Sequence, residues 1–296
     1  MADLLRTRPG GPGTLRELLR RDEPLLAPGA YDALGARLIE AAGFEAVYMT
    51  GFGAAASLLG RPDVGLLGLS EMAGHAARLA AAVDVPLIAD ADTGYGNAVT
   101  VIRTVQEYER AGVAALHLED QVQPKRCGHM AGKDVVAVGE MVAKLRAATD
   151  ARSDPDLVLI ARTDARAVEG LDAALDRARA YRDAGADMLF VEALEGVGEI
   201  ERVAAELAGT PLLFNWVEGG RTPPLSLAEL TAMGFALVIM PITTLLAATA
   251  AMRAVLAQVK ADGTPQQAAT DLPSFDDMVE AVGLGEISRL ERRYTP

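Results

Sequence analysis

The feature that most constrains this chain is a unit that recurs along its sequence. A helical stretch ends in glycine, and a short apolar run follows at once and usually finishes at a polar residue; this occurs at 42–50, 111–119, 184–192 and 233–241. Glycine is the usual left-handed residue after a helix, and nearly continuous apolar runs are typical of strands buried on both faces. The unit therefore predicts helices that alternate with parallel strands.

Four further apolar runs complete the pattern, at 25–27, 86–90, 157–162 and 211–215. Amphipathic stretches such as 171–182 and 227–232 separate the runs. Eight strands that alternate with helices predict an α/β fold, a (β/α)₈ TIM barrel, and enzymes with this fold carry their active site at the C-terminal ends of the strands. The polar residues that end the strands are therefore candidates for a site.

Three regions are expected along the chain. Residues 1–13, with several glycines and prolines, predict a flexible lead-in, and residues 14–262 predict the catalytic barrel. A polar stretch at 261–267 predicts a linker into a C-terminal helical arm at 263–296. Apolar positions recur at helical spacing in this arm, so we expect it to pack on the barrel or on a neighbouring subunit.

Composition and charge exclude several classes of partner. The formal net charge of -13 at pH 7 would repel nucleic acid and anionic membrane surfaces. One cysteine excludes an intrachain disulfide, and residues 1–13 lack the apolar stretch of a signal peptide, so we expect a cytoplasmic protein. The uncharged stretch 231–252 has the length of a membrane span. Pro241 interrupts it, which favours a buried strand, a loop and a buried helix.

Three carboxylates are expected to meet at neighbouring strand ends. Asp90 and Asp92 are two residues apart, so the alternation of a strand would aim both side chains the same way, and Glu119 ends the next strand. Such carboxylates repel one another unless a divalent cation neutralises them, and all-oxygen ligation suits Mg²⁺ or Mn²⁺. The alternative is that these residues are solvated or cap the following helices.

The only cysteine, Cys127, lies in the run Lys-Arg-Cys-Gly-His at 125–129. The cations of this run, on Lys125, Arg126 and His129, would each favour thiolate over thiol and lower the pKa of the cysteine. A lone cysteine is often only a small buried hydrophobe. Polar neighbours and a glycine argue against burial here, so we interpret Cys127 as a mobile acid/base catalyst.

Other strand ends offer polar groups to an anionic substrate. Arg162 would either grip a carboxylate or phosphonate through two N–H groups or form a structural salt bridge. Glu192 and Asn215 end later strands, and the glycine-rich turn at 50–53 offers backbone N–H groups and a hydroxyl to another carboxylate. The histidines at 75 and 117 are interpreted as structural.

Together these motifs resemble those of one enzyme superfamily. The stretches that carry the resemblance are Tyr-Met-Thr-Gly at 48–51, Leu-Gly-Arg-Pro-Asp at 59–63, Ala-Asp-Ala-Asp-Thr-Gly-Tyr-Gly at 89–96, His-Leu-Glu-Asp-Gln at 117–121, the cysteine run, Ala-Arg-Thr-Asp at 161–164, and Asn215. In unbroken order over residues 14–293, the chain resembles the isocitrate lyase/phosphoenolpyruvate mutase superfamily.

The resemblance implies a barrel whose last helix is exchanged between subunits, usually in a dimer of dimers, and hence a homotetramer. It also implies Mg²⁺ at Asp92 and, partly through water, at Asp90 and Glu119, with residues 125–129 on a gating loop that closes over the substrate. The implied catalytic residues are Tyr48 as a candidate general base, Glu119, Lys125, Arg126, Cys127, His129 and Arg162. The implied substrate-binding residues are Thr50, Gly51, Phe52, Asp63, Cys127, Gly128, Arg162, Glu192 and Asn215.

Two departures from the family bear on the substrate. Methylisocitrate lyases carry two arginines for a third carboxylate, and the corresponding residues here are Leu246 and Phe275. Without those arginines the carboxylate would be buried and unpaired, so 2-methylisocitrate is disfavoured. We predict a Mg²⁺-dependent lyase that breaks a carbon–carbon bond of a 2-hydroxy dicarboxylate, of the 2-methylmalate or dimethylmalate type, through an enolate.

Three alternatives stay open for a small carboxylate or phosphonate ligand. The stretches 124–129 and 217–223 are especially similar to those of carboxyphosphonoenolpyruvate mutases, which form a carbon–phosphorus bond, although dimethylmalate lyases share much of them. An oxaloacetate decarboxylase is the second alternative. A barrel retained only as a binding protein is the third, and it is disfavoured because every acid/base and metal position is filled.

Overall fold

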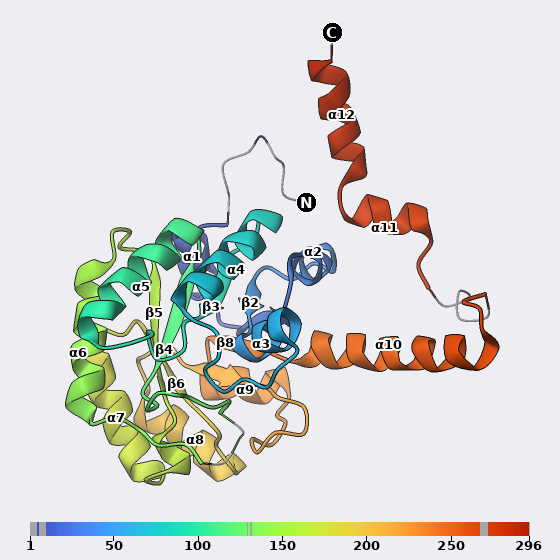
Figure 1. The fold of residues 1–296 in the computed structure, drawn as a ribbon. Coiled ribbons are helices and arrows are strands. Elements are labelled where there is room, and N and C mark those ends of the chain that lie inside the picture. The colour runs from blue at the N-terminus through green and yellow to red at the C-terminus, as the bar shows by residue number, and fades with distance from the viewer. Residues whose placement is uncertain (1–4, 6–9, 129, 131, 267–271, 296) are drawn as a thin grey trace.

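The computed structural model describes residue 5 and residues 10–128, 130, 132–266 and 272–295. Eight parallel strands form one sheet in the order β6-β5-β4-β3-β2-β1-β8-β7. A parallel bridge between Leu189 and Leu212 links the two ends of this sheet, so the barrel is nearly closed. Figure 1 shows the strands at the centre with helices packed around them. The predicted TIM barrel is confirmed.

All eight predicted runs form strands, with ends that differ from the prediction by a few residues at most. The strands are β1 (Leu25–Ala30), β2 (Val47–Met49), β3 (Leu87–Asp90), β4 (Ala115–Glu119), β5 (Val158–Thr163), β6 (Met188–Val191), β7 (Leu213–Asn215) and β8 (Leu237–Met240). The barrel helices are α1 (Pro12–Leu18), α2 (Ala33–Ala41), α3 (Gly51–Leu59), α4 (Leu69–Ala82), α5 (Ala98–Ala111), α6 (Val138–Ala151), α7 (Leu171–Asp183), α8 (Val197–Glu206) and α9 (Leu227–Met233), with a short 3₁₀ turn at Ala165–Ala167.

The glycines of the recurring unit end the helices as expected. Gly112 and Gly234 are the C-caps of α5 and α9, with φ angles of 81° and 80°. Gly43 and Gly185 follow α2 and α7 with φ angles of 90° and 106°. Glycine adopts this left-handed backbone without the steric cost that other residues meet. Each helix therefore stops just before the strand that follows it.

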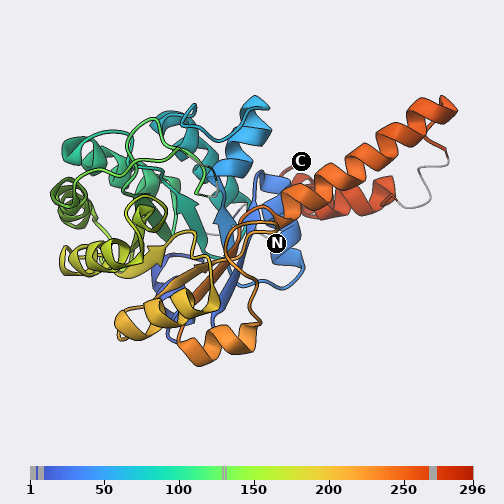
Figure 2. The same cartoon turned by 90° about the horizontal axis from the view of Figure 1, so that it is seen from below.

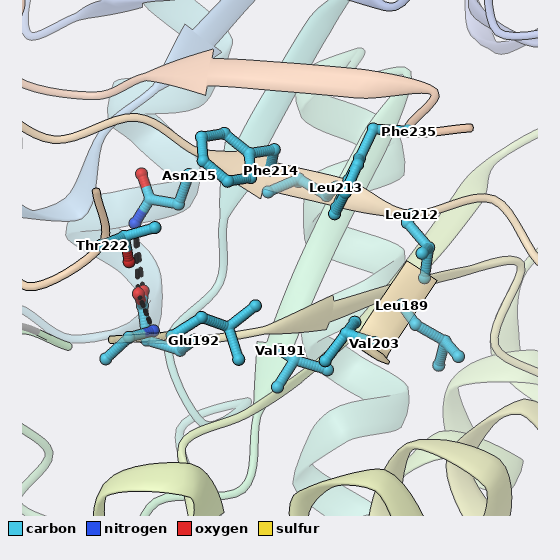
Figure 3. A pocket seen from close by; sticks show the side chains of 12 residues that line it. Leu189, Val191, Glu192, Val203, Leu212, Leu213, Phe214, Asn215, Thr222 and Phe235 are labelled. Atoms are coloured by element: carbon cyan, nitrogen blue, oxygen red, sulfur yellow. Dashed lines mark hydrogen bonds between the residues drawn. The ribbon is translucent and has the colours of Figure 1, made fainter. Parts of the chain in front are cut away.

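Packing closes the seam between β6 and β7, where one bridge replaces a full ladder. Figure 3 shows apolar side chains from both strands lining this seam. They leave a gap of only about 10 Å³. The rings of Phe214 and Phe235 meet edge to face, with centroids 5.5 Å apart. Glu192 and Asn215 lie at one end of the seam, joined by a hydrogen bond from Asn215 Nδ2 to Glu192 Oε2 of 3.1 Å. The seam thereby ends at the polar mouth of the barrel.

Buried apolar residues form two layers that follow the alternation of the strands. One layer fills the barrel interior and includes Tyr48, Ile160 and Phe190. The other, larger layer lies between the strands and the surrounding helices. Helix α1 contributes Leu15 and Leu18 to the interior layer, so it plugs the N-terminal end of the barrel. A site is therefore expected at the opposite, C-terminal end.

The C-terminal arm leaves the barrel and contains two helices after α10 (Thr243–Asp262), namely α11 (Phe275–Ala281) and α12 (Leu284–Tyr294). Figures 1 and 2 show α10 projecting outward and the last two helices lying away from the strands. Gly283, with a φ of 87°, separates α11 from α12, so the predicted single helical segment is divided. Residues 1–4 and 6–9 of the predicted lead-in lie outside the described residues, and α1 begins inside the predicted lead-in, at Pro12.

The uncharged stretch 231–252 comprises the end of α9, strand β8 and the first half of α10. The buried strand and the loop at Pro241 are confirmed, but the prediction of a buried helix is wrong, because α10 has no buried residue within this chain. Within the described residues, no helix has both the length and the apolar character needed to cross a membrane.

Candidate active site

A cleft of about 250 Å³ opens at the C-terminal end of the barrel. Nine of the predicted site residues line it: Tyr48, Thr50, Phe52, Asp63, Asp90, Cys127, Arg162, Glu192 and Asn215. Sequence reasoning missed the residues that supply most of its apolar wall: Met130, Val217, Ile239, Pro241 and Ile242. These residues lie at or after the ends of β7 and β8 or near the cysteine. Apolar residues are common at such positions, so their type alone does not indicate that they line a binding site.

The three predicted metal-binding residues are buried near the mouth, each 1–5% exposed. Asp90 ends β3 and accepts N–H groups from Gly51 at 3.2 Å and Asp92 at 2.9 Å. The prediction that strand alternation orients Asp92 is wrong, because β3 ends at Asp90 and Asp92 has a φ of 47°. A turn, and not the strand, sets the direction of the Asp92 side chain.

Two cations already lie against these carboxylates. Lys125 Nζ is 2.6 Å from Asp92 Oδ1 and 2.7 Å from Asp63 Oδ1, and Arg162 Nε is 3.3 Å from Glu119 Oε2. Over the ranges that the structure describes, no three His, Cys, Asp or Glu side chains gather as metal ligands. The three carboxylates therefore do not converge as metal ligands in this arrangement, and Lys125 and Arg162 provide part of the neutralising charge.

The carboxylates nevertheless fit a hard divalent cation. Burial raises the pKa of Asp92 to about 7, and it raises the pKa of Glu119 well above its usual value. Glu119 Oε1 is buried without a hydrogen-bond partner among the described residues. Buried oxygens that lack sufficient positive charge form the kind of donor set that Mg²⁺ and Mn²⁺ prefer.

Arg162 is held at the mouth by several acidic groups. Its Nε donates to Asp164 Oδ2 at 2.9 Å, and its Nη2 lies 3.2 Å from Glu192 Oε2. The guanidinium also stands over the ring of Phe190, 5.0 Å from the centroid. Although burial opposes its charge, Asp164 and Glu119 raise the pKa of Arg162 well above its usual value. The arginine is a permanent cation that faces the cleft.

Cys127 is partly exposed and lines the cleft, while its N–H donates to the carbonyl of Asp63 at 3.2 Å. Lys125, which we expected to act on the thiol, directs its ammonium to Asp63 and Asp92 instead. The backbone of Arg126 is clamped by Gln121, which accepts its N–H at 2.9 Å and donates to its carbonyl at 2.8 Å. The predicted role of His129 falls on a residue outside the described ones.

In the turn after β2, two polar groups that we predicted to bind a substrate carboxylate form hydrogen bonds within the protein instead. Thr50 is the N-cap of α3, and its hydroxyl accepts the Gly53 N–H at 3.1 Å. Gly51 donates its N–H to Asp90, and a Cβ at Gly51 would lie 2.3 Å from Asp90 Oδ2. The turn therefore positions Asp90, whereas Phe52 is the residue that adds an apolar surface to the cleft.

Inside the barrel, His117 contacts Tyr48. From the sequence we interpreted His117 as structural and did not predict this contact. Tyr48 Oη lies 2.8 Å from His117 Nε2, which in turn lies 3.6 Å from Asp90 Oδ1. Burial lowers the pKa of His117 to about 4 and raises the pKa of Tyr48 well above its usual value. The sequence did contain an indication of this position: His117 is two residues before Glu119 on the same strand, and such residues share a face.

A family model described as phosphoenolpyruvate phosphomutase matches residues 15–260. The chain is 49% identical to 2,3-dimethylmalate lyase of Eubacterium barkeri, over 95% of this chain and 96% of that protein. The chain belongs to the PEP mutase/isocitrate lyase superfamily.

Other members of the superfamily carry different names. A probable 2-methylisocitrate lyase of Corynebacterium glutamicum is 48% identical, over 81% of this chain and 78% of that protein. The chloroplastic carboxyvinyl-carboxyphosphonate phosphorylmutase of Arabidopsis thaliana is 42% identical, over 94% of this chain and 83% of that protein. The family thus comprises lyases and mutases on one fold.

Solved structures of superfamily members have the same fold as this chain. A crystal structure of 2,3-dimethylmalate lyase superposes with a TM-score of 0.91 at 43% identity, covering 96% of this chain and 94% of that one. Phosphonopyruvate hydrolase, crystallised with oxalate and Mg²⁺, superposes with a TM-score of 0.88 at 34% identity, covering 97% of this chain and all of that one. The resemblance noted in the sequence is confirmed at the level of the superfamily.

Proposed function

We propose that this protein is a Mg²⁺-dependent lyase that cleaves a 2-hydroxy dicarboxylate of the 2,3-dimethylmalate type. The observation that carries the proposal is the composition of the cleft. Arg162 and Cys127 face a space that also has an apolar wall, which includes Val217, Ile239 and Ile242. The chain is similar over nearly its whole length to a dimethylmalate lyase. A methylated dicarboxylate needs this combination of one fixed cation and an apolar surface.

Asp90, Asp92 and Glu119 are the residues that would hold the metal. Their burial and the unpartnered Glu119 Oε1 support this assignment, and so does the Mg²⁺ bound to a related hydrolase. When bound, a divalent cation would stabilise negative charge on the substrate oxygens. Mn²⁺ would serve the same role because it accepts the same oxygen ligands.

The proposed reaction breaks the bond between the hydroxyl-bearing carbon and its methylated neighbour. Arg162 holds a substrate carboxylate and shares the charge that develops on it. The substrate hydroxyl gives its proton to Tyr48 Oη, while Tyr48 passes its own proton to neutral His117, 2.8 Å away. This relay avoids a free tyrosinate, which the raised pKa of Tyr48 disfavours. Burial also lowers the pKa of His117, but Asp90, 3.6 Å away, offsets part of the cost of the imidazolium charge.

Cleavage leaves the electron pair on the methylated carbon, next to the second carboxylate, as an enolate. The thiol of Cys127 donates its proton to this carbon. From 2,3-dimethylmalate the products are pyruvate and propionate, and the proton on His117 returns to the Cys127 thiolate through water. Every atom of the substrate is accounted for without a further reactant.

A phosphonomutase and an oxaloacetate-cleaving enzyme are the competing functions. The Arabidopsis mutase, at 42% identity, supports the first, and a solved oxaloacetate acetylhydrolase, at 40% identity and a TM-score of 0.91, supports the second. Either would use Arg162 and the same carboxylates. 2-Methylisocitrate is less favoured because Leu246 and Phe275 offer no charge to a third carboxylate.

We also propose that the arm is exchanged between subunits in a homotetramer. The helices α10, α11 and α12 bury no residue within this chain. Large apolar side chains on them are exposed, including Leu256 at 66% and Phe275 at 80%. A second copy of the chain would cover these side chains and remove them from water.

The test of the function is a comparison of substrates by proton and phosphorus NMR. Purified enzyme with Mg²⁺ is incubated separately with 2,3-dimethylmalate, 2-methylisocitrate, oxaloacetate and phosphonopyruvate. We expect pyruvate and propionate from 2,3-dimethylmalate, and slower turnover of the other three. Conversion of phosphonopyruvate without cleavage of dimethylmalate would overturn the proposal in favour of a mutase or hydrolase.

A further inference from the structure

The segment 125–128, here called the cysteine segment, lies directly on the anion-binding arginine. A Cβ built on Gly128 would lie 2.5 Å from Arg162 Nη2 and 2.6 Å from Glu192 Cδ, closer than real Cβ atoms approach other groups. Only glycine allows the backbone to come this near. The cysteine segment is therefore closed over Arg162, and some interaction must keep it there.

Lys133 supplies such an interaction. This lysine is 9% exposed, and its ammonium donates both to the carbonyl of Gly128 and to Asp164 Oδ1, the latter at 2.7 Å. Asp164 is the same carboxylate that receives Arg162 Nε at 2.9 Å and Nη2 at 3.2 Å. One buried carboxylate thus holds both the arginine and, through Lys133, the segment that carries Cys127.

Asp164 is itself fixed by the barrel wall. Its N–H donates to Asp120 Oδ1 at 2.9 Å, and Asp120 Oδ2 accepts the hydroxyls of Thr163 and Tyr181, each at 2.7 Å. Asp120 is fully buried at the end of β4, and Tyr181 reaches it from α7. The anchor therefore belongs to the rigid part of the fold, whereas the Gly128 carbonyl belongs to the segment that it restrains.

We infer that Lys133 is a positioning residue that latches the cysteine segment to Asp164 and so places Cys127 over a substrate held by Arg162. This role deepens the proposed function, but it does not depend on which carboxylate or phosphonate the cleft accepts. A lysine that only stabilised the fold would bond to the wall alone. The bond to the Gly128 carbonyl links this lysine to the position of the thiol.

The test uses the chain's single cysteine as a reporter. The ligand-free, full-length enzyme and its Lys133→Met variant are treated with iodoacetamide, and alkylation of Cys127 is followed by intact mass. We expect the variant to react at least about five-fold faster, because the segment opens more often. Loss of a nearby cation would disfavour the thiolate and slow the reaction, so a faster rate reports access and not pKa.

Arg152→Met is the matched control, since Arg152 pairs with Asp187 at 2.6 Å at the other end of the barrel. Its alkylation rate should match that of the wild type even if its melting temperature falls as far as that of Lys133→Met. Lys133→Arg, which keeps the charge and the donors, should restore most of the protection, and it serves if Lys133→Met does not fold. With dimethylmalate, kcat of Lys133→Met should fall at least about ten-fold and KM should change less.

Equal alkylation rates in Lys133→Met and the wild type would overturn the inference, and so would equal acceleration in Arg152→Met. Failure of the proposed function would look different. In that case the wild type would produce no pyruvate from dimethylmalate, while the difference in Cys127 alkylation would persist.

Discussion

Charged side chains at the two ends of the barrel are balanced in different ways. At the N-terminal end, Asp187 lies 3.0 Å from Arg16 Nη2 and 2.6 Å from Arg152 Nη1, and all three side chains reach solvent. At the C-terminal end, seven buried carboxylates lie among five buried cations. The carboxylates are those of Asp63, Asp90, Asp92, Glu119, Asp120, Asp164 and Glu192, and the cations are those of Lys125, Lys133, Lys144, Arg162 and Arg177.

This contrast indicates that stability is lower at the end of the barrel that carries the candidate site. Buried carboxylates in excess of their cations are costly, because the low dielectric of the interior strengthens repulsion and removes hydration. At the opposite end of the barrel, Asp187, which precedes β6, is one carboxylate paired with two arginines. The under-neutralised end is the one that opens to a cleft and can receive a cation and a substrate.

The largest effect is expected from Cys127→Ser, which removes the proton donor from the C-terminal end without changing its charge balance. A serine hydroxyl is a much weaker acid than a thiol, so kcat should fall by about 10³-fold. Binding of Mg²⁺ and oxalate, measured by calorimetry, should stay within a few-fold of the wild type. Turnover close to that of the wild type would remove Cys127 from the mechanism.

A pair of charge-neutral substitutions contrasts the two ends directly. Glu119→Gln removes a buried carboxylate whose pKa is raised by burial, so the metal-free melting temperature should rise or stay constant. Asp187→Asn breaks two ion pairs and should cost about 1–3 kcal/mol in the free energy of unfolding. Thermal unfolding without metal measures both changes.

Addition of Mg²⁺ should affect the two variants differently. Metal binding to the native state should raise the melting temperature of the wild type and of Asp187→Asn by similar amounts. Glu119→Gln should lose most of that increase. A loss of stability in metal-free Glu119→Gln as large as that in Asp187→Asn would contradict the view that the C-terminal end is under-neutralised.

A smaller effect is expected from adding one methyl group at Gly128. Gly128→Ala forces the cysteine segment away from Arg162 and Glu192, so kcat/KM should fall about ten-fold. The melting temperature should change little, because the segment contributes few buried apolar groups. Gly139→Ala is the control: this glycine is in α6, a Cβ there meets nothing within 4 Å, and the substitution should leave activity unchanged. Equal activity of both variants would argue against close approach of the segment.

The fold was predictable because its signal repeats. Glycine stops such as Gly112 and the apolar runs after them are local features, and the barrel follows from their number and order. Candidate site residues were predictable from the same pattern, since Glu119 and Arg162 each lie at a strand end.

Pairings between distant residues were not predictable in the same way. Lys125 binds Asp63, which is 62 residues away in the sequence, and Lys133 binds Asp164, which is 31 residues away. These partners are chosen by strand register and by the path of the loops, which no local pattern specifies. Asp92 shows the same limit, since a left-handed turn residue cannot be oriented by counting along a strand.

The most direct test of the central claim is cleavage of 2,3-dimethylmalate in D₂O with Mg²⁺, followed by proton NMR. The account predicts equal amounts of pyruvate and propionate, with one deuteron at the carbon of propionate that was bonded to the hydroxyl-bearing carbon. That deuteron would come from the exchanged thiol of Cys127, so Cys127→Ser should form little of either product. Absence of propionate in the wild-type reaction, or propionate formed equally fast by Cys127→Ser, would contradict the account.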